Sequence, residues 1–98
     1  MLRSPHVVEH GWGMKVSARI QERVNWYAGE QLRALRGTMS RVDFGESIGM
    51  KESLMHKYET GQTNISVATL ATLARRLEVP LSVFILPDDD PVFSETED

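Results

Sequence analysis

The sequence predicts an all-α protein. Apolar side chains recur every three or four residues along residues 16–36 and again along residues 67–77, which is the spacing of one face of an α-helix. Between and after these stretches, Gly37, Gly49 and Gly61 stand at positions where a residue without a Cβ can end a helix. Helical periodicity with regularly placed stops indicates a small helical domain.

Five helical segments are expected, over about residues 16–36, 41–48, 51–59, 67–77 and 81–86. Serine hydroxyls are expected to cap three of these helices by accepting a hydrogen bond from a free backbone N–H: those of Ser17, Ser40 and Ser66. The first segment forms either one long helix or two helices with a bend near Gly29. Gly45 should weaken the second helix by about 0.5–1 kcal/mol relative to alanine.

The 98 residues are enough for one domain with one hydrophobic core. Residues 1–15 show no helical or strand period and are interpreted as an N-terminal extension. Residues 16–86 form the helical domain, and residues 87–98 form an acidic tail that is expected to be mobile. His6 and His10 are four residues apart, but the proline and glycines around them argue against the helix that would make them metal ligands, so no metal site is expected.

The chain contains no cysteine, which excludes disulfides and thiolate metal sites and is compatible with a reducing cytosol. Its longest apolar run, around residues 79–86, is far shorter than the roughly 20 residues that cross a bilayer. The N-terminus has no apolar core of the length that a secretory signal needs. We therefore expect a cytoplasmic protein without a membrane partner.

Charge is distributed unevenly along the chain. The formal net charge is −3, but 6 of the 14 acidic residues and none of the 11 basic residues lie in residues 87–98. Residues 1–86 therefore carry a net charge of +3. The net acidity of the chain does not exclude a nucleic-acid partner, because the arrangement of charge matters more than its sum.

The second and third segments are two short helices joined by a tight turn at Gly49, which is the pattern of a helix-turn-helix. Residues 29–86 resemble the Cro/lambda-repressor family of helix-turn-helix DNA-binding proteins, also called the xenobiotic-response-element family. Five blocks in a fixed order carry the resemblance: LRALRG at 32–37, MSRVDFGESIGM at 39–50, KYETG at 57–61, SVATLATLARRLEVP at 66–80 and LSVFI at 81–85. The resemblance implies a five-helix lambda-repressor-like fold and double-stranded DNA as a partner.

In this family the third helix enters the major groove with its N-terminus first, while the second helix crosses the DNA backbone. Lysine can donate to guanine, glutamate can accept from cytosine, and serine can do either, so the start of the third helix could recognise a sequence. Asn64 stands where similar proteins often carry a basic residue, so one phosphate contact is expected to be weaker. The residues expected at the DNA are Arg41, Lys51, Glu52, Ser53, His56, Lys57, Thr63 and Asn64.

The resemblance also implies an ion pair between Arg36 and Glu59, which we interpret as structural.

Val42 and Leu54 occupy positions that are usually polar in the family. They contact the N-terminal extension, thymine methyl groups or a protein partner, and the sequence does not choose among these. The acidic tail is expected to repel DNA phosphates and to compete for Arg41, Lys51 and Lys57.

A homodimer is expected, because the apolar side chains after the fourth helix exceed what a core of this size can cover on one side. The alternative is that they complete the core of the monomer, and a second possible interface is the first helix around Ile20, Val24 and Trp26. The residues expected at the dimer interface are Leu81, Val83, Phe84 and Ile85.

No catalytic constellation is evident, so no enzymatic activity and no cofactor are expected. The leading interpretation is a dimeric repressor of a phage, mobile-element or restriction-control operon that binds a pseudo-palindromic operator. One alternative is the antitoxin of a toxin–antitoxin pair, which would repress its own operon and bind a toxin. Another is a protein-binding helix-turn-helix adaptor or anti-activator.

Overall fold

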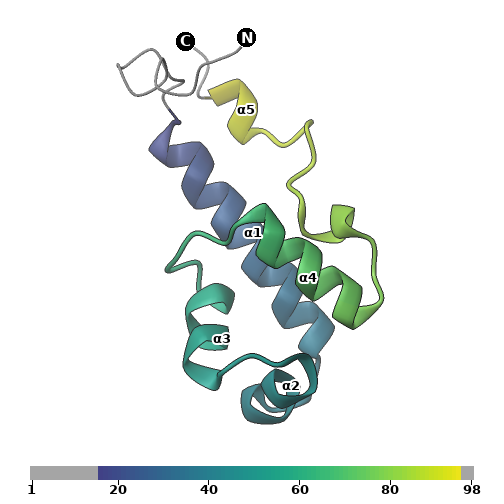
Figure 1. Cartoon of the computed structure of the whole chain (residues 1–98). Coiled ribbons are helices and arrows are strands. Elements are labelled where there is room, and N and C mark those ends of the chain that lie inside the picture. Colours follow the sequence, from purple (N-terminus) through teal and green to yellow (C-terminus); the bar gives the residue numbers. More distant parts are fainter. Residues whose placement is uncertain (1–15, 96–98) are drawn as a thin grey trace, which may run out of the picture.

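The computed structural model of the chain describes residues 16–95, and all regular structure within them is helical (Figure 1). The expected all-α architecture is confirmed. The N-terminal extension over residues 1–15, with His6 and His10, lies outside the described residues, as does the end of the acidic tail at 96–98. The elements are α1 (Ala18–Arg36), α2 (Arg41–Ile48), α3 (Glu52–Glu59), α4 (Val67–Leu77), the short 3₁₀ helix η2 (Leu81–Phe84) and α5 (Val92–Glu95).

The helix boundaries follow from the residues expected to set them. Ser17, Ser40 and Ser66 each accept a hydrogen bond from the backbone N–H three residues later, which caps α1, α2 and α4. Gly49 follows α2 with a φ of 75°, in the left-handed region that glycine enters without a Cβ clash. Glu78 ends α4 with a φ of 60°, a conformation in which a side chain is strained.

Two glycines allow backbones to approach closely. A Cβ on Gly29 would overlap the carbonyl oxygen of Tyr58, and a Cβ on Gly45 would overlap that of Met50. The bend considered near Gly29 is absent, because α1 is one helix of 19 residues and Gly29 is where the end of α3 packs against it. Gly45 likewise serves the packing of α2 against the turn, so alanine would not simply strengthen that helix.

The hydrophobic core lies among α1, α2, α3, α4 and η2. The helix α1 packs against α3 and η2, while α2 packs against α3 and α4 (Figure 1). Met55 is fully buried at the centre of α3, which holds this helix against the rest of the domain. The buried core cluster consists of Ala28, Leu32, Phe44, Ile48, Met55, Tyr58, Leu70, Leu73, Ala74 and Phe84.

The structure corrects the expected dimer interface at Phe84. This side chain is only 1% exposed, because η2 packs against both α1 and α4 and buries it in the monomer core. Leu81 also packs against the core and is half-buried, as is Val83. Ile85 is 44% exposed and is therefore the one residue of the expected set that is largely accessible.

The acidic segment also differs from the mobile tail that was expected. Asp90 and α5 pack against the beginning of α1 (Figure 1). Val92 is 1% exposed, and the carboxylates of Asp90 and Glu95 form ion pairs with arginines of α1. The carboxylates can lie together here because basic side chains offset their repulsion. No helix among residues 16–95 is long and apolar enough to cross a membrane.

Gly29→Ala should lower the free energy of unfolding by about 1–3 kcal/mol, because the added methyl group must displace backbone at the contact between α1 and α3. At an ordinary helix position the same change would stabilise by about 1 kcal/mol. Urea unfolding of the variant measures the effect, with Ala34→Gly on the exposed face of α1 as the control for helix propensity alone. A stabilised Gly29→Ala variant would show that this contact leaves room for a Cβ.

Candidate nucleic-acid interface

The helix α3 separates a buried face from an exposed polar face. Met55, Tyr58 and Glu59 are buried, while Ser53 and Lys57 lie on the opposite side of the helix. The other residues expected on this surface, Lys51, Glu52 and His56, are exposed as well. The structure therefore brings together, on one accessible helix face, the five side chains of α3 and its cap that the sequence assigned to DNA. We call Lys51, Glu52, Ser53, His56 and Lys57 the docking face.

Two hydrogen bonds hold the turn between α2 and α3. The N–H of Met50 donates to the carbonyl oxygen of Gly45 at 2.7 Å, which closes the end of α2. The Arg76 Nη1 atom, from α4, donates to the carbonyl oxygen of Ile48 at 2.6 Å. The role of Arg76 was not expected, because an arginine near the end of an amphipathic helix normally interacts with solvent or with its own helix terminus. These contacts fix the angle at which α3 presents its first turn.

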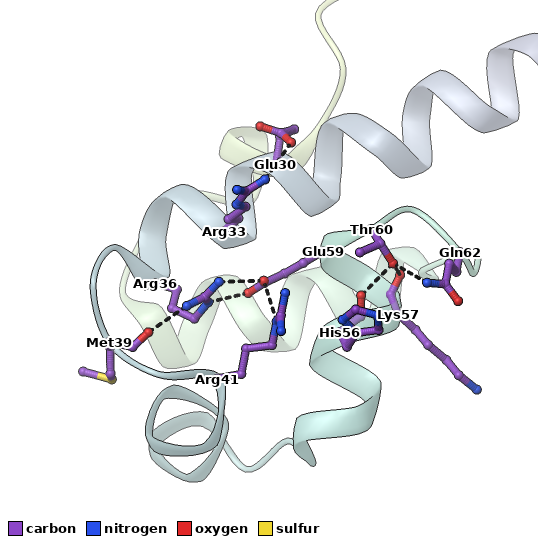
Figure 2. A network of polar contacts seen from close by, with 10 residues as sticks. All are labelled: Glu30, Arg33, Arg36, Met39, Arg41, His56, Lys57, Glu59, Thr60 and Gln62. Atoms are coloured by element: carbon purple, nitrogen blue, oxygen red, sulfur yellow. Dashed lines mark hydrogen bonds and ion pairs between the residues drawn. The ribbon is translucent and has the colours of Figure 1, made fainter.

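A buried ion-pair network supports the docking face from behind (Figure 2). The carboxylate of Glu59, 1% exposed, accepts hydrogen bonds from Nε and Nη2 of Arg36 at 2.7 and 2.9 Å. Arg36 Nη1 also donates to the carbonyl oxygen of Met39 at 2.8 Å, which fixes the chain between α1 and α2. The ion pair between Arg36 and Glu59 is thus present in the structure.

Arg41 also belongs to this network. Its Nε donates to Glu59 Oε1 at 3.1 Å, and its side chain is 33% exposed (Figure 2). A guanidinium at the beginning of α2 opposes the helix dipole, and the pairing with Glu59 offsets this cost. Arg41 was expected only at the DNA, and the structure gives it a structural role as well.

The ionisation of Glu59 results from two opposing effects. Burial of the carboxyl group would raise its pKa, but hydrogen bonds and charge from Arg36 and Arg41 outweigh burial and hold the pKa of Glu59 below its ordinary value. The carboxylate therefore stays ionised at neutral pH. Two cations around one buried anion give this network a net positive charge close to the docking face.

The segment after α3 is tied to α1 by two asparagines. Asn25, 8% exposed, donates from Nδ2 to Asn64 Oδ1 at 2.7 Å and accepts from Gln21 Nε2 at 3.1 Å. Asn64 is exposed and Thr63 is half-buried, so both expected contacts lie on an accessible loop. The role of Asn25 was not expected from the sequence. A polar residue among the apolar positions of α1 could have indicated a buried hydrogen bond there.

Val42 and Leu54 are exposed apolar side chains close to the turn. Their exposed fractions are 52% and 37%. Leu54 lines a groove of about 510 Å³ between α3 and α4, whereas Val42 lines one of about 410 Å³ between α2 and the turn. The N-terminal extension lies outside the described residues, so its contact with Val42 and Leu54 is not described. The other two expected contacts of these side chains are thymine methyl groups and a protein partner.

Comparison with known proteins gives a family for this arrangement. A family model described as a helix-turn-helix domain matches residues 28–83, which is more than half of the chain. The match begins within α1, contains α2, the turn, α3 and α4, and ends within η2. No curated protein matches the chain.

Arg36→Ala should lower the free energy of unfolding by about 3–5 kcal/mol, because it leaves the buried Glu59 carboxylate with one partner. Arg41→Ala should cost only about 1–2 kcal/mol, since Arg36 still donates two hydrogen bonds. Chemical unfolding compares the two variants. Arg33→Ala, which removes a largely exposed arginine from the same helix as Arg36, is the control and should change stability by less than about 0.5 kcal/mol. Equal losses from Arg36→Ala and Arg41→Ala would contradict the assignment of Arg36 as the main partner.

Proposed function

The chain belongs to the helix-turn-helix domain family, and on that premise we propose that it is a sequence-specific transcriptional regulator of the Cro/lambda-repressor type. The proposed role is that of a cytoplasmic repressor of a phage, mobile-element or restriction-control operon, without catalytic activity. The observation that carries this proposal is the docking face, an exposed polar surface at the beginning of α3, directly opposite the fully buried Met55.

The docking face has the chemistry needed to recognise base edges. Ser53 and Lys57 are four residues apart and lie on the same outward side of α3, so both reach the same stretch of a major groove. The carboxylate of Glu52 disfavours indiscriminate binding to phosphates, because it must be placed against a donor such as the amino group of cytosine. Mixed charge on this face therefore favours recognition of a particular sequence over general affinity for DNA.

A second function is favoured by the two exposed apolar side chains beside the turn. Val42 and Leu54 flank the docking face and line grooves, as a protein-binding adaptor or an antitoxin that holds a toxin would require. Selection of DNA from a random duplex library distinguishes the two functions. Enrichment of a defined sequence supports the regulator, and absence of any enrichment supports the adaptor.

Lys57→Ala should weaken binding to the selected duplex at least about tenfold, because it removes a donor from the centre of the docking face. Its thermal stability should stay within about 0.5 kcal/mol of the wild type, since the side chain is exposed. Fluorescence anisotropy with the labelled duplex measures the affinity. Arg75→Ala removes an exposed cation from α4 and is the control for net charge. Equal weakening by the two variants would mean that the docking face is misassigned.

We propose a homodimer as the DNA-binding form, because two copies of α3 about 34 Å apart could bind successive major grooves of a pseudo-palindromic operator. With Phe84 in the core, the proposed interface is reduced to Ile85 and the accessible parts of Leu81 and Val83. Trp26, 49% exposed on α1, marks the alternative interface.

Ile85→Asp should convert the dimer to a folded monomer that binds the selected duplex much more weakly, because binding through two half-sites is lost. Sedimentation velocity measures the mass, and circular dichroism measures the fold. Trp26→Asp serves as the comparison variant. A dimer that survives Ile85→Asp and dissociates with Trp26→Asp would place the interface on α1.

A further inference from the structure

Two parts of the described chain lie outside the family match and pack against each other. The first ten residues of α1, Ala18–Tyr27, precede the matched region, and residues 87–95 follow it. Figure 1 shows α5 against the beginning of α1, so these two segments form an addition to the helix-turn-helix domain. An addition of this kind can carry a function that the family description does not include.

The contact between the two segments consists mainly of arginine–carboxylate pairs. Asp90, whose side chain is 8% exposed, accepts two hydrogen bonds from Arg23, at 3.1 Å from Nε and 2.8 Å from Nη2. Arg19 donates from Nε to Glu95 at 2.7 Å. One apolar side chain, Val92, is buried in the same segment. Arg23 and Arg19 are four residues apart, so both guanidinium groups lie on one face of α1.

These arginines line a groove that reaches the proposed DNA surface. The groove has a volume of about 520 Å³ and is lined by Arg19, Glu22, Arg23, Trp26, Thr60 and Gly61. Thr60 directly follows α3, and its hydroxyl donates to the carbonyl oxygen of His56 at 2.7 Å. Figure 2 shows Thr60 and Gln62 close to Lys57, at the end of α3. The arginine groove therefore borders the docking face.

Apart from the carboxylate of Glu22, the groove has the chemistry of a site for the DNA backbone. An arginine fork binds a phosphate in the same bidentate geometry with which Arg23 binds the Asp90 carboxylate. Arg23 also stacks over the ring of Trp26, with its Cζ atom 4.9 Å from the ring centroid, which keeps the guanidinium close to the groove. Asp90 and Glu95 thus occupy two guanidinium groups of the kind that bind phosphates.

We propose that Arg19 and Arg23 form a second contact for the phosphates of duplex DNA, and that Asp90 and Glu95 cover this contact in the free protein. The proposal rests on the proposed function as a DNA-binding regulator. In this arrangement the acidic segment limits DNA affinity by occupying two specific arginines. This differs from the sequence-based expectation that the tail competes for Arg41 and the lysines of the docking face.

The test compares two double variants with the same change in net charge. Asp90→Asn with Glu95→Gln frees both arginines, whereas Asp88→Asn with Asp89→Asn neutralises two exposed carboxylates of the same segment that are outside the ion pairs. Affinity for a random-sequence 30-base-pair duplex is measured between 50 and 200 mM salt. The first pair should bind more tightly than the wild type at low salt, and its gain should shrink about tenfold across this range, as expected for two added phosphate contacts. The second pair should show no such change in salt dependence.

Adding Arg19→Gln and Arg23→Gln to the first pair should abolish the gain. Equal gains from the two pairs would overturn the proposal in favour of net charge alone, and no gain from the first pair would leave the ion pairs with a purely structural role. If the first pair does not fold, Glu95→Gln alone frees the exposed Arg19 and should give half of the change in salt slope. Failure of the wild type to bind any duplex would instead contradict the proposed function itself.

Discussion

The buried carboxylate of Glu59 is the constraint on which the rest of the domain depends. One anion at the end of α3 binds Arg36 from the end of α1 and Arg41 from the beginning of α2, so three helices meet at a single charge. Because a buried carboxylate without a partner is strongly unfavourable, these contacts penalise arrangements of the three helices that separate Glu59 from its arginines. The position of the docking face follows from this placement.

Gly29, Gly45 and Arg76 also determine how the helices are placed. Gly29 lets the backbone of α3 approach α1, and Gly45 lets the turn close against α2, while Arg76 holds the carbonyl end of α2 from α4. Each contact is made by backbone or by a charged group, so the geometry of the helix-turn-helix depends on more than the apolar core. A rigid support of this kind is what recognition of base edges requires, because hydrogen bonds in the major groove tolerate little misplacement.

Much of this fold is predictable from local sequence patterns, and the failures have physical reasons. Caps at Ser17, Ser40 and Ser66 were predictable because a cap depends on residues three positions apart. The burial of Phe84 and the ion pair of Asp90 were not predictable. Both depend on how segments distant in the sequence pack against α1. For the site, the resemblance to the helix-turn-helix family assigned Ser53 and Lys57 to the DNA surface, but the pairing of Arg41 with Glu59 depends on how α2 and α3 cross. Patterns along one helix predict its faces, whereas contacts between helices depend on the complete fold.

The central claim is that the first turns of α3 meet DNA while Glu59 and its arginines stay intact behind them. Backbone amide chemical shifts of the labelled protein, followed as the selected duplex is added, test this most directly. If α3 docks in this way, the largest shifts should fall on residues 51–57 and 60–64, and the amide signals of Arg36 and Glu59 should persist. Shifts concentrated around Val42 and Leu54 with residues 51–53 unaffected, or loss of the Arg36 and Glu59 signals on binding, would contradict it.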